Sequence, residues 1–79
     1  EDRNKPNFSV YPNPSSGVIN FEGDFIPKWI RILDITGKTV LETSLSSNTL
    51  NIEFLNNGLY FGQFIGENNE QVTKRILKQ

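Results

Sequence analysis

The sequence predicts an all-β protein, and three observations lead to this prediction. Short runs rich in β-branched and aromatic residues recur roughly every eight to twelve residues, and Gly, Asn or Pro separates each run from the next. No segment longer than a turn has the 3.6-residue hydrophobic period of an amphipathic helix. Seven such runs predict a seven-stranded antiparallel β-sandwich. Because the Cys–Trp–Cys pattern of antibody domains is missing, the term Ig-like describes only its architecture.

The composition of the chain narrows its function. The 79 residues include no Cys and no His, and the net charge is −1. Zinc sites built on Cys or His, thiol chemistry and His-based catalysis are therefore excluded in this chain, and the charge provides no field to attract nucleic acid. A single domain of this size buries only roughly 60% of its unfolded surface, which leaves little room for a catalytic cleft. We expect no enzyme activity, cofactor, metal or small-molecule substrate.

A stiff turn is predicted between the first two strands, at Tyr11-Pro12-Asn13-Pro14-Ser15-Ser16-Gly17. Each proline fixes its own φ and disfavours the helical region for the residue before it. The side chains of Asn13 and the two serines are expected to satisfy nearby backbone groups, and Gly17 is expected to adopt a positive φ. We expect the Tyr11 ring to pack against the core with its hydroxyl bonded to nearby backbone.

The strand at residues 29–34 gives the strongest local signal. Most of its residues are β-branched or aromatic, and Ile30 and Ile32 share one face. Asp34 then begins a tight turn in which its carboxylate caps backbone amides, and Gly37 supplies a positive φ. The expected strands are 8–10, 18–22, 29–34, 39–43, 50–54, 59–65 and 72–77.

Two of these strands differ in which of their faces are apolar. Residues 50–54 alternate strictly, so Ile52 and Phe54 are expected to share one apolar side. Residues 59–65 are apolar on both faces, and this strand is therefore expected to lie in the centre of a sheet. Gly62 within it suggests a β-bulge or the close approach of an aromatic ring.

Four spaced blocks stand out when the chain is taken as a whole. They are Val10-Tyr11-Pro12-Asn13-Pro14-Ser15-Ser16-Gly17, Ile32-Leu33-Asp34-Ile35-Thr36-Gly37-Lys38-Thr39-Val40, Gly58-Leu59-Tyr60-Phe61 and Thr73-Lys74-Arg75-Ile76-Leu77-Lys78. In this order, from about Phe8 to the end, the chain resembles the type A C-terminal sorting domain of the type IX (Por) secretion system. Two positions depart from the family's pattern, because Leu33 stands where Tyr is frequent and Gln79 follows the terminal lysine.

The resemblance implies a non-enzymatic signal at the end of a multidomain cargo protein of Gram-negative Bacteroidetes. Such cargo reaches the periplasm through an N-terminal signal, and the outer-membrane translocon and its shuttle protein then recognise the C-terminal domain. A cell-surface sortase commonly removes this domain, after which the cargo stays on the outer-membrane surface or is secreted. On this interpretation residues 1–7 are the linker to the upstream cargo, and residues 8–79 are the sorting domain.

The family's motif residues carry over position by position. The resemblance assigns partner binding, by translocon recognition, to Gly58, Tyr60, Lys74, Arg75 and Lys78. We expect the last strand and the Gly58–Tyr60 turn to form the docking surface by β-augmentation, in which a partner adds a strand to a sheet edge. The proline turn is then mainly structural. The structural motif consists of Tyr11, Pro12, Asn13, Pro14, Gly17, Asp34 and Gly37.

Two other functions fit the same fold. An adhesive or carbohydrate-binding module would stack sugar rings on exposed aromatics, for which Trp29, Tyr60 and Phe61 are the candidates, although a small domain needs its aromatics for its core. A passive Ig-like spacer is the other possibility, and it would be expected to recur in tandem. Position discriminates between these functions, because a sorting signal lies at the true C-terminus, whereas a binding module tolerates residues after Gln79.

Overall fold

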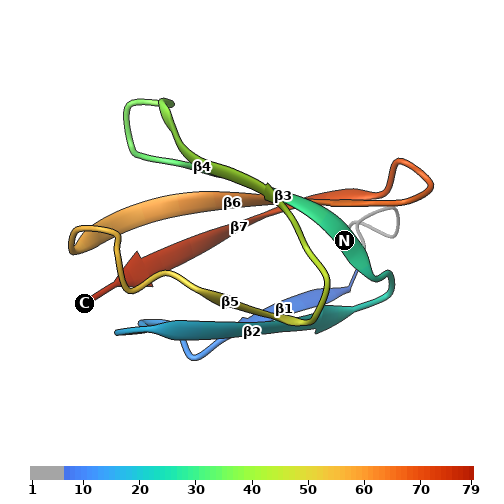
Figure 1. The fold of residues 1–79 in the computed structure, drawn as a ribbon, viewed down its shortest axis with the longest axis horizontal. Coiled ribbons are helices and arrows are strands. Elements are labelled where there is room, and N and C mark those ends of the chain that lie inside the picture. The colour runs from blue at the N-terminus through green and yellow to red at the C-terminus, as the bar shows by residue number, and fades with distance from the viewer. Residues whose placement is uncertain (1–6) are drawn as a thin grey trace.

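The computed structural model describes residues 7–79, which form seven β-strands in two sheets that pack face to face (Figure 1). Within this range there is no helix, and so none that is long and apolar enough to cross a membrane. The strands are β1 Phe8–Tyr11, β2 Val18–Gly23, β3 Pro27–Leu33, β4 Thr39–Ser44, β5 Thr49–Asn51, β6 Gly58–Gly66 and β7 Gln71–Lys78.

All pairings between these strands are antiparallel. One sheet has three strands in the order β1-β2-β5, and the other has four strands in the order β4-β3-β6-β7. β6 has a neighbour on each side, as its two apolar faces predict. The all-β fold with the architecture of an Ig-like sandwich is therefore confirmed.

The core lies between the inner faces of the two sheets. Phe64 of β6 is fully buried at its centre, and its ring centroid lies 4.9 Å from that of Phe8 and 5.1 Å from that of Phe21. Ile30 and Ile32 both point into the core, as the alternation along β3 predicts. The buried hydrophobic residues are Phe8, Ile19, Phe21, Phe25, Ile30, Ile32, Ile52, Leu55, Tyr60, Phe64 and Ile76.

The connections between strands divide between the two ends of the sandwich, because neighbouring strands run in opposite directions. The connections that follow β1, β3 and β5 lie at the same end as the C-terminus (Figure 1). We refer to this as the C-terminal end. The connections that follow β2, β4 and β6 lie at the opposite end. The proline turn and the end of β7 are therefore close together.

β5 is shorter than the sequence predicts. The side-chain Oδ1 of Asn51 accepts a hydrogen bond from the Glu53 amide (2.8 Å), and the Leu55 amide donates one to the Ile52 carbonyl (3.0 Å). These bonds bend the chain into a turn, which leaves Phe54 61% exposed while Ile52 and Leu55 are buried. The prediction that Ile52 and Phe54 share one side of a longer strand is therefore wrong.

Gly62 makes room for neighbouring side chains without a β-bulge. The register between β6 and β7 is regular through this position. A Cβ on Gly62 would lie 2.8 Å from Cδ1 of Ile76 and 3.3 Å from Cε1 of Phe64. Of the two predicted alternatives, close approach is therefore the correct one, although an isoleucine approaches nearer than the aromatic ring.

Candidate functional site

The side chain of Asn13 connects the proline turn to the last strand. Its Nδ2 donates a hydrogen bond to the carbonyl oxygen of Arg75 (2.8 Å), and its Oδ1 accepts one from the amide of Leu77 (2.9 Å). The peptide bonds before Pro12 and Pro14 are both cis. A primary amide carries a donor and an acceptor side by side, as a peptide unit does. Asn13 therefore bonds the outer edge of β7 as a neighbouring strand would, instead of the nearby backbone groups that the sequence predicts.

Ser15 extends this pairing with its backbone. Its amide donates to the carbonyl oxygen of Leu77, and its carbonyl accepts a hydrogen bond from the Gln79 amide, each at 2.9 Å. The two bonds form a parallel bridge between Ser15 and Lys78. Ser15 is buried at this point. We refer to Asn13 and Ser15 together as the edge clamp, because they cover the end of an edge strand.

The rest of the proline turn follows the predictions in part. The Ser15 hydroxyl accepts a hydrogen bond from the Gly17 amide and donates one to the Val18 carbonyl, both at 3.3 Å, and these are local bonds of the predicted kind. Gly17 does not have a positive φ, which the described glycines adopt only at Gly37 and Gly58. The prediction for Gly17 is therefore wrong, and nothing within 4 Å of the position of its missing Cβ explains the glycine.

The tyrosine that packs against the core is Tyr60 and not Tyr11. Tyr11 is 44% exposed, and its hydroxyl makes only a long hydrogen bond to Oε1 of Glu22 (3.4 Å). Since Phe8 faces the core, the alternation along β1 turns Tyr11 toward solvent, and the prediction for Tyr11 is wrong. Tyr60 is buried, and its hydroxyl donates a hydrogen bond to the carbonyl oxygen of Asn56 (2.7 Å).

Three of the expected recognition residues lie close together in space at the C-terminal end of the sandwich. They are Gly58 and Tyr60 at the start of β6 and Lys78 at the end of β7. Gly58 pairs with Lys78, and Tyr60 is two residues further along β6. The Lys78 residue is only 7% exposed, and its Nζ reaches Oδ1 of Asn57 at 3.5 Å. Since Tyr60 is also buried, these residues hold the end of the chain in place and offer little surface to a partner.

The basic residues of the last block do not form one patch. Side chains alternate along β7, so Lys74 and Lys78 share the inward side of the strand. Arg75 lies on the solvent side together with Thr73 and Leu77, and all three are exposed. Lys74 is half-buried, so Arg75 is the basic residue of this block that a partner reaches most easily.

A known family accounts for nearly the whole chain. A family model described as a secretion system C-terminal sorting domain matches residues 9–79, which include the edge clamp and all of β7. The chain belongs to this family. The matched family is the sorting domain of the type IX secretion system, so the resemblance of the four sequence blocks is confirmed. Among curated proteins, no relative matches the chain.

Membership gives this sorting domain a function in export. A type IX sorting domain is a non-catalytic signal, and it directs the protein that carries it to the cell surface or into the medium. Within residues 7–79, no group of three or more His, Cys, Asp or Glu side chains is placed to hold a metal ion.

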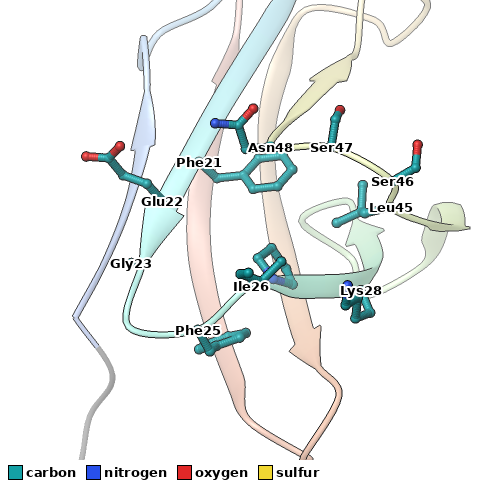
Figure 2. Close-up of a pocket in the computed structure, with 11 residues that line it drawn as sticks. Phe21, Glu22, Gly23, Phe25, Ile26, Lys28, Leu45, Ser46, Ser47 and Asn48 are labelled. Atoms are coloured by element: carbon teal, nitrogen blue, oxygen red, sulfur yellow. The ribbon is translucent and has the colours of Figure 1, made fainter.

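A cavity of about 380 Å³ opens at the end of the sorting domain opposite the edge clamp. Figure 2 shows the residues that line it. It lies beside the connections that follow β2 and β4, and the apolar part of its lining comes from Phe21, Phe25, Ile26, Pro27 and Leu45. Both phenylalanines are buried, so neither offers a free ring face for stacking against a sugar. Tyr60, one of the aromatic candidates for sugar binding, is buried elsewhere in the core. The cavity therefore gives the carbohydrate-binding alternative no support.

The turn between β3 and β4 of the sorting domain forms as the sequence predicts. Oδ1 of Asp34 accepts hydrogen bonds from the Thr36 hydroxyl (2.6 Å), the Thr36 amide (2.9 Å) and the Lys38 amide (3.1 Å). Gly37 has a φ of 89°, a value that glycine adopts most easily. The bond from the Thr36 hydroxyl, and after it the bond from the Lys38 amide, lower the pKa of Asp34 below its usual value.

The Asp34→Asn variant is expected to have a flatter dependence of stability on pH. Because the pKa of Asp34 is lowered in the folded state, its ionised form stabilises the fold above the unfolded pKa of about 4. This contribution is lost as the pH falls through the folded pKa. Urea unfolding measured from neutral to acidic pH checks the prediction. Equal acid slopes in the variant and the wild type would contradict it.

Sequence reasoning misses two features of the edge clamp and of the solvent side of β7. For Ser15 the sequence predicts local bonds only, yet its backbone pairs with a strand more than sixty residues away in the chain. No signal near Ser15 points to that strand. Thr73 and Leu77 belong to the fourth sequence block but receive no role from it, and the alternation of β7 places both on the same side as Arg75. That periodic pattern is the signal that identifies them.

Proposed function

We propose that this sorting domain carries an upstream cargo protein across the outer membrane by docking its last strand on the type IX translocon and its shuttle protein. The edge clamp is the observation that supports this, because Asn13 and Ser15 fix the end of β7 and leave the Arg75 side chain exposed. A translocon that accepts many unrelated cargoes needs a tag whose shape does not depend on the cargo. A strand held in place also loses little freedom when it binds.

We place the partner contacts on the solvent side of β7. Arg75 and its neighbours on that side are exposed, whereas Gly58 is half-buried, and Tyr60 and Lys78 are buried. In this proposal Gly58, Tyr60 and Lys78 act as positioning residues that hold the strand. Lys74 is half-buried and contributes to the rim of the surface.

We further propose that a cell-surface sortase removes the domain by cutting before Phe8. The Asn7 amide donates a hydrogen bond to Oδ2 of Asp24 (2.9 Å), and the Asp24 amide donates one to the Asn7 carbonyl (2.8 Å). These bonds tie the chain to the sandwich from Asn7 onward. The proposed linker of residues 1–7 includes residues 1–6, which lie outside the described range. Cargo and domain pass through the periplasm together in this scheme, and the cargo is then anchored at the surface or released.

A fusion protein tests the sorting function. The domain is attached to the C-terminus of a periplasm-targeted fluorescent protein in a type IX-competent host and in a secretion-null strain. We expect fluorescence at the surface or in the medium only in the competent strain. Retention of a folded fusion in the periplasm of both strains would contradict the proposal and favour an adhesive or carbohydrate-binding module.

Deletion of the last residues is a poor test of the same idea. Removing residues 74–79 takes away Ile76, which is 1% exposed in the core. It also removes the partners of the edge clamp. The deletion is therefore expected to unfold the domain, and single substitutions on β7 separate recognition from folding more cleanly.

A further inference from the structure

Part of the outer edge of β7 has unpaired backbone groups. In an antiparallel ladder, residues whose backbone groups point to the partner strand alternate with residues whose groups point away. Leu77 points away from β6, because its amide and carbonyl bond to the edge clamp. The register between β6 and β7 is regular, so Gln71, Thr73 and Arg75 point away from β6 as well.

The edge clamp covers only the C-terminal half of this edge. It occupies the carbonyl of Arg75, both backbone groups of Leu77 and the amide of Gln79. Within residues 7–79, no hydrogen-bond partner is present for the amides of Gln71, Thr73 and Arg75 or for the carbonyls of Gln71 and Thr73. An edge with a row of unpaired groups is a template for another strand.

β7 is also the longest strand at any edge of the two sheets. It has eight residues, whereas the other edge strands β4, β1 and β5 have six, four and three. Figure 1 shows β7 next to β6, with its last residues at the C-terminal end. The edge clamp occupies its last residues, so the part of this strand that is open to an added strand is residues 71–75.

The charge of this edge favours an acidic partner. β7 contains Lys74, Arg75 and Lys78 and no acidic residue. The Arg75 side chain is exposed, and the ion pair within the described part of the chain joins Arg31 to Glu42 instead (3.0 Å). The guanidinium of Arg75 is thus available to a carboxylate, with which it forms a bidentate pair in favourable geometry.

We propose that the partner docks by adding an extended strand to β7 along residues 71–75, with a carboxylate of that strand next to the Arg75 guanidinium. This inference rests on the proposed sorting function and specifies how the last strand is recognised. Main-chain hydrogen bonds supply affinity in this mode, and side-chain contacts supply specificity. The edge clamp limits the added strand, because Asn13 already occupies the next backbone groups of the edge.

The Thr73→Pro variant of the fluorescent fusion tests strand addition directly. Proline removes the outward amide and leaves the bonds between β6 and β7 in place, because the backbone groups of Thr73 point away from β6. The control Thr73→Val keeps the amide and the β-branched shape. We expect export of Thr73→Pro to fall by about tenfold or more, and Thr73→Val to be exported like the wild type. Wild-type export of a folded Thr73→Pro fusion would overturn the proposal.

The Arg75→Glu variant decides the question if Thr73→Pro does not fold. It changes only an exposed side chain, and it places a negative charge against the proposed carboxylate. We expect export to fall by about tenfold, with Arg75→Lys much closer to the wild type. Unchanged export of Arg75→Glu would overturn the proposal that the added strand places a carboxylate next to Arg75. The unmodified fusion separates the two proposals, because its retention in both strains would contradict the sorting function itself.

Discussion

The Phe64→Ala variant is expected to lose about 3–5 kcal/mol of unfolding free energy, the usual effect of truncating a buried phenylalanine. Phe64 is fully buried, and its ring packs against the rings of Phe8 and Phe21 from the opposite sheet. A domain of 79 residues has a total stability of about 4–12 kcal/mol. Urea unfolding should therefore show the loss of a quarter or more of the total stability, and at the lower end of that range the variant is unfolded.

Phe61→Ala is the matched control for this prediction. Phe61 lies on the same strand, three residues before Phe64, but it is half-buried on the solvent side of the sheet. We expect its truncation to lower the free energy of unfolding by about 1 kcal/mol. Equal losses in the two variants would contradict the assignment of Phe64 to the centre of the core. A fusion that carries Phe64→Ala should also be exported less well than one that carries Phe61→Ala, since a larger fraction of its tag is unfolded.

The core was predictable because alternation along a strand identifies which side chains share a face. Ile30 and Ile32 are two residues apart, and both are fully buried. The run at 59–65 is apolar on both faces, and it corresponds to β6, which has a neighbour on each side. Local turn chemistry was equally informative at Asp34, whose carboxylate caps the amides of Thr36 and Lys38.

The end of β5 was not predictable from alternation, because a turn can place the same residues differently. Ile52 and Phe54 alternate as strand residues do, but the Asn51 side chain captures the Glu53 amide and ends the ladder. Similarly, the sequence offers two tyrosines, Tyr11 and Tyr60, whose rings could pack against the core. Which of them is buried depends on which alternate residues of its strand face inward. In β1 the buried residue Phe8 faces inward, so Tyr11, three residues later, faces solvent and is exposed.

The contacts of the edge clamp could not be predicted from the neighbouring sequence. The Asn13 amide is equally able to bond to neighbouring backbone or to a strand that arrives much later in the chain. Its partners, Arg75 and Leu77, are 62 and 64 residues away. Only the packing of the two sheets brings the proline turn next to the end of β7. The sequence therefore identifies Asn13 as a motif residue without revealing which residues it contacts.

The Asn13→Ala variant is expected to lower the free energy of unfolding by about 1–3 kcal/mol, because it removes two hydrogen bonds worth about 0.5–1.5 kcal/mol each. This is a large effect for an exposed residue, since most surface substitutions change stability by less than about 0.5 kcal/mol. Urea unfolding measures the loss. Hydrogen exchange at the Leu77 amide should also become faster, because that amide loses its acceptor.

Two further variants make the result specific to the clamp. Asn48→Ala is the control, because Asn48 is exposed and no side-chain hydrogen bond of Asn48 occurs within the described part of the chain. Asn13→Asp keeps the acceptor for the Leu77 amide, but it replaces the donor to the Arg75 carbonyl with a second oxygen. We expect Asn13→Asp to be at least as unstable as Asn13→Ala. Equal stability of Asn13→Ala and Asn48→Ala would contradict the clamp.

Loss of the clamp should affect recognition as well as stability. Without Asn13, the carbonyl of Arg75 and the amide of Leu77 are also unpaired. An added strand could then pair with β7 in more than one register. Ile52→Val provides a comparison, because it trims a fully buried side chain and lowers stability by about 0.5–1.5 kcal/mol without touching β7. If the clamp fixes the register of docking, Asn13→Ala should be exported less well than Ile52→Val at equal stability. Equal export would mean that the clamp acts through stability alone.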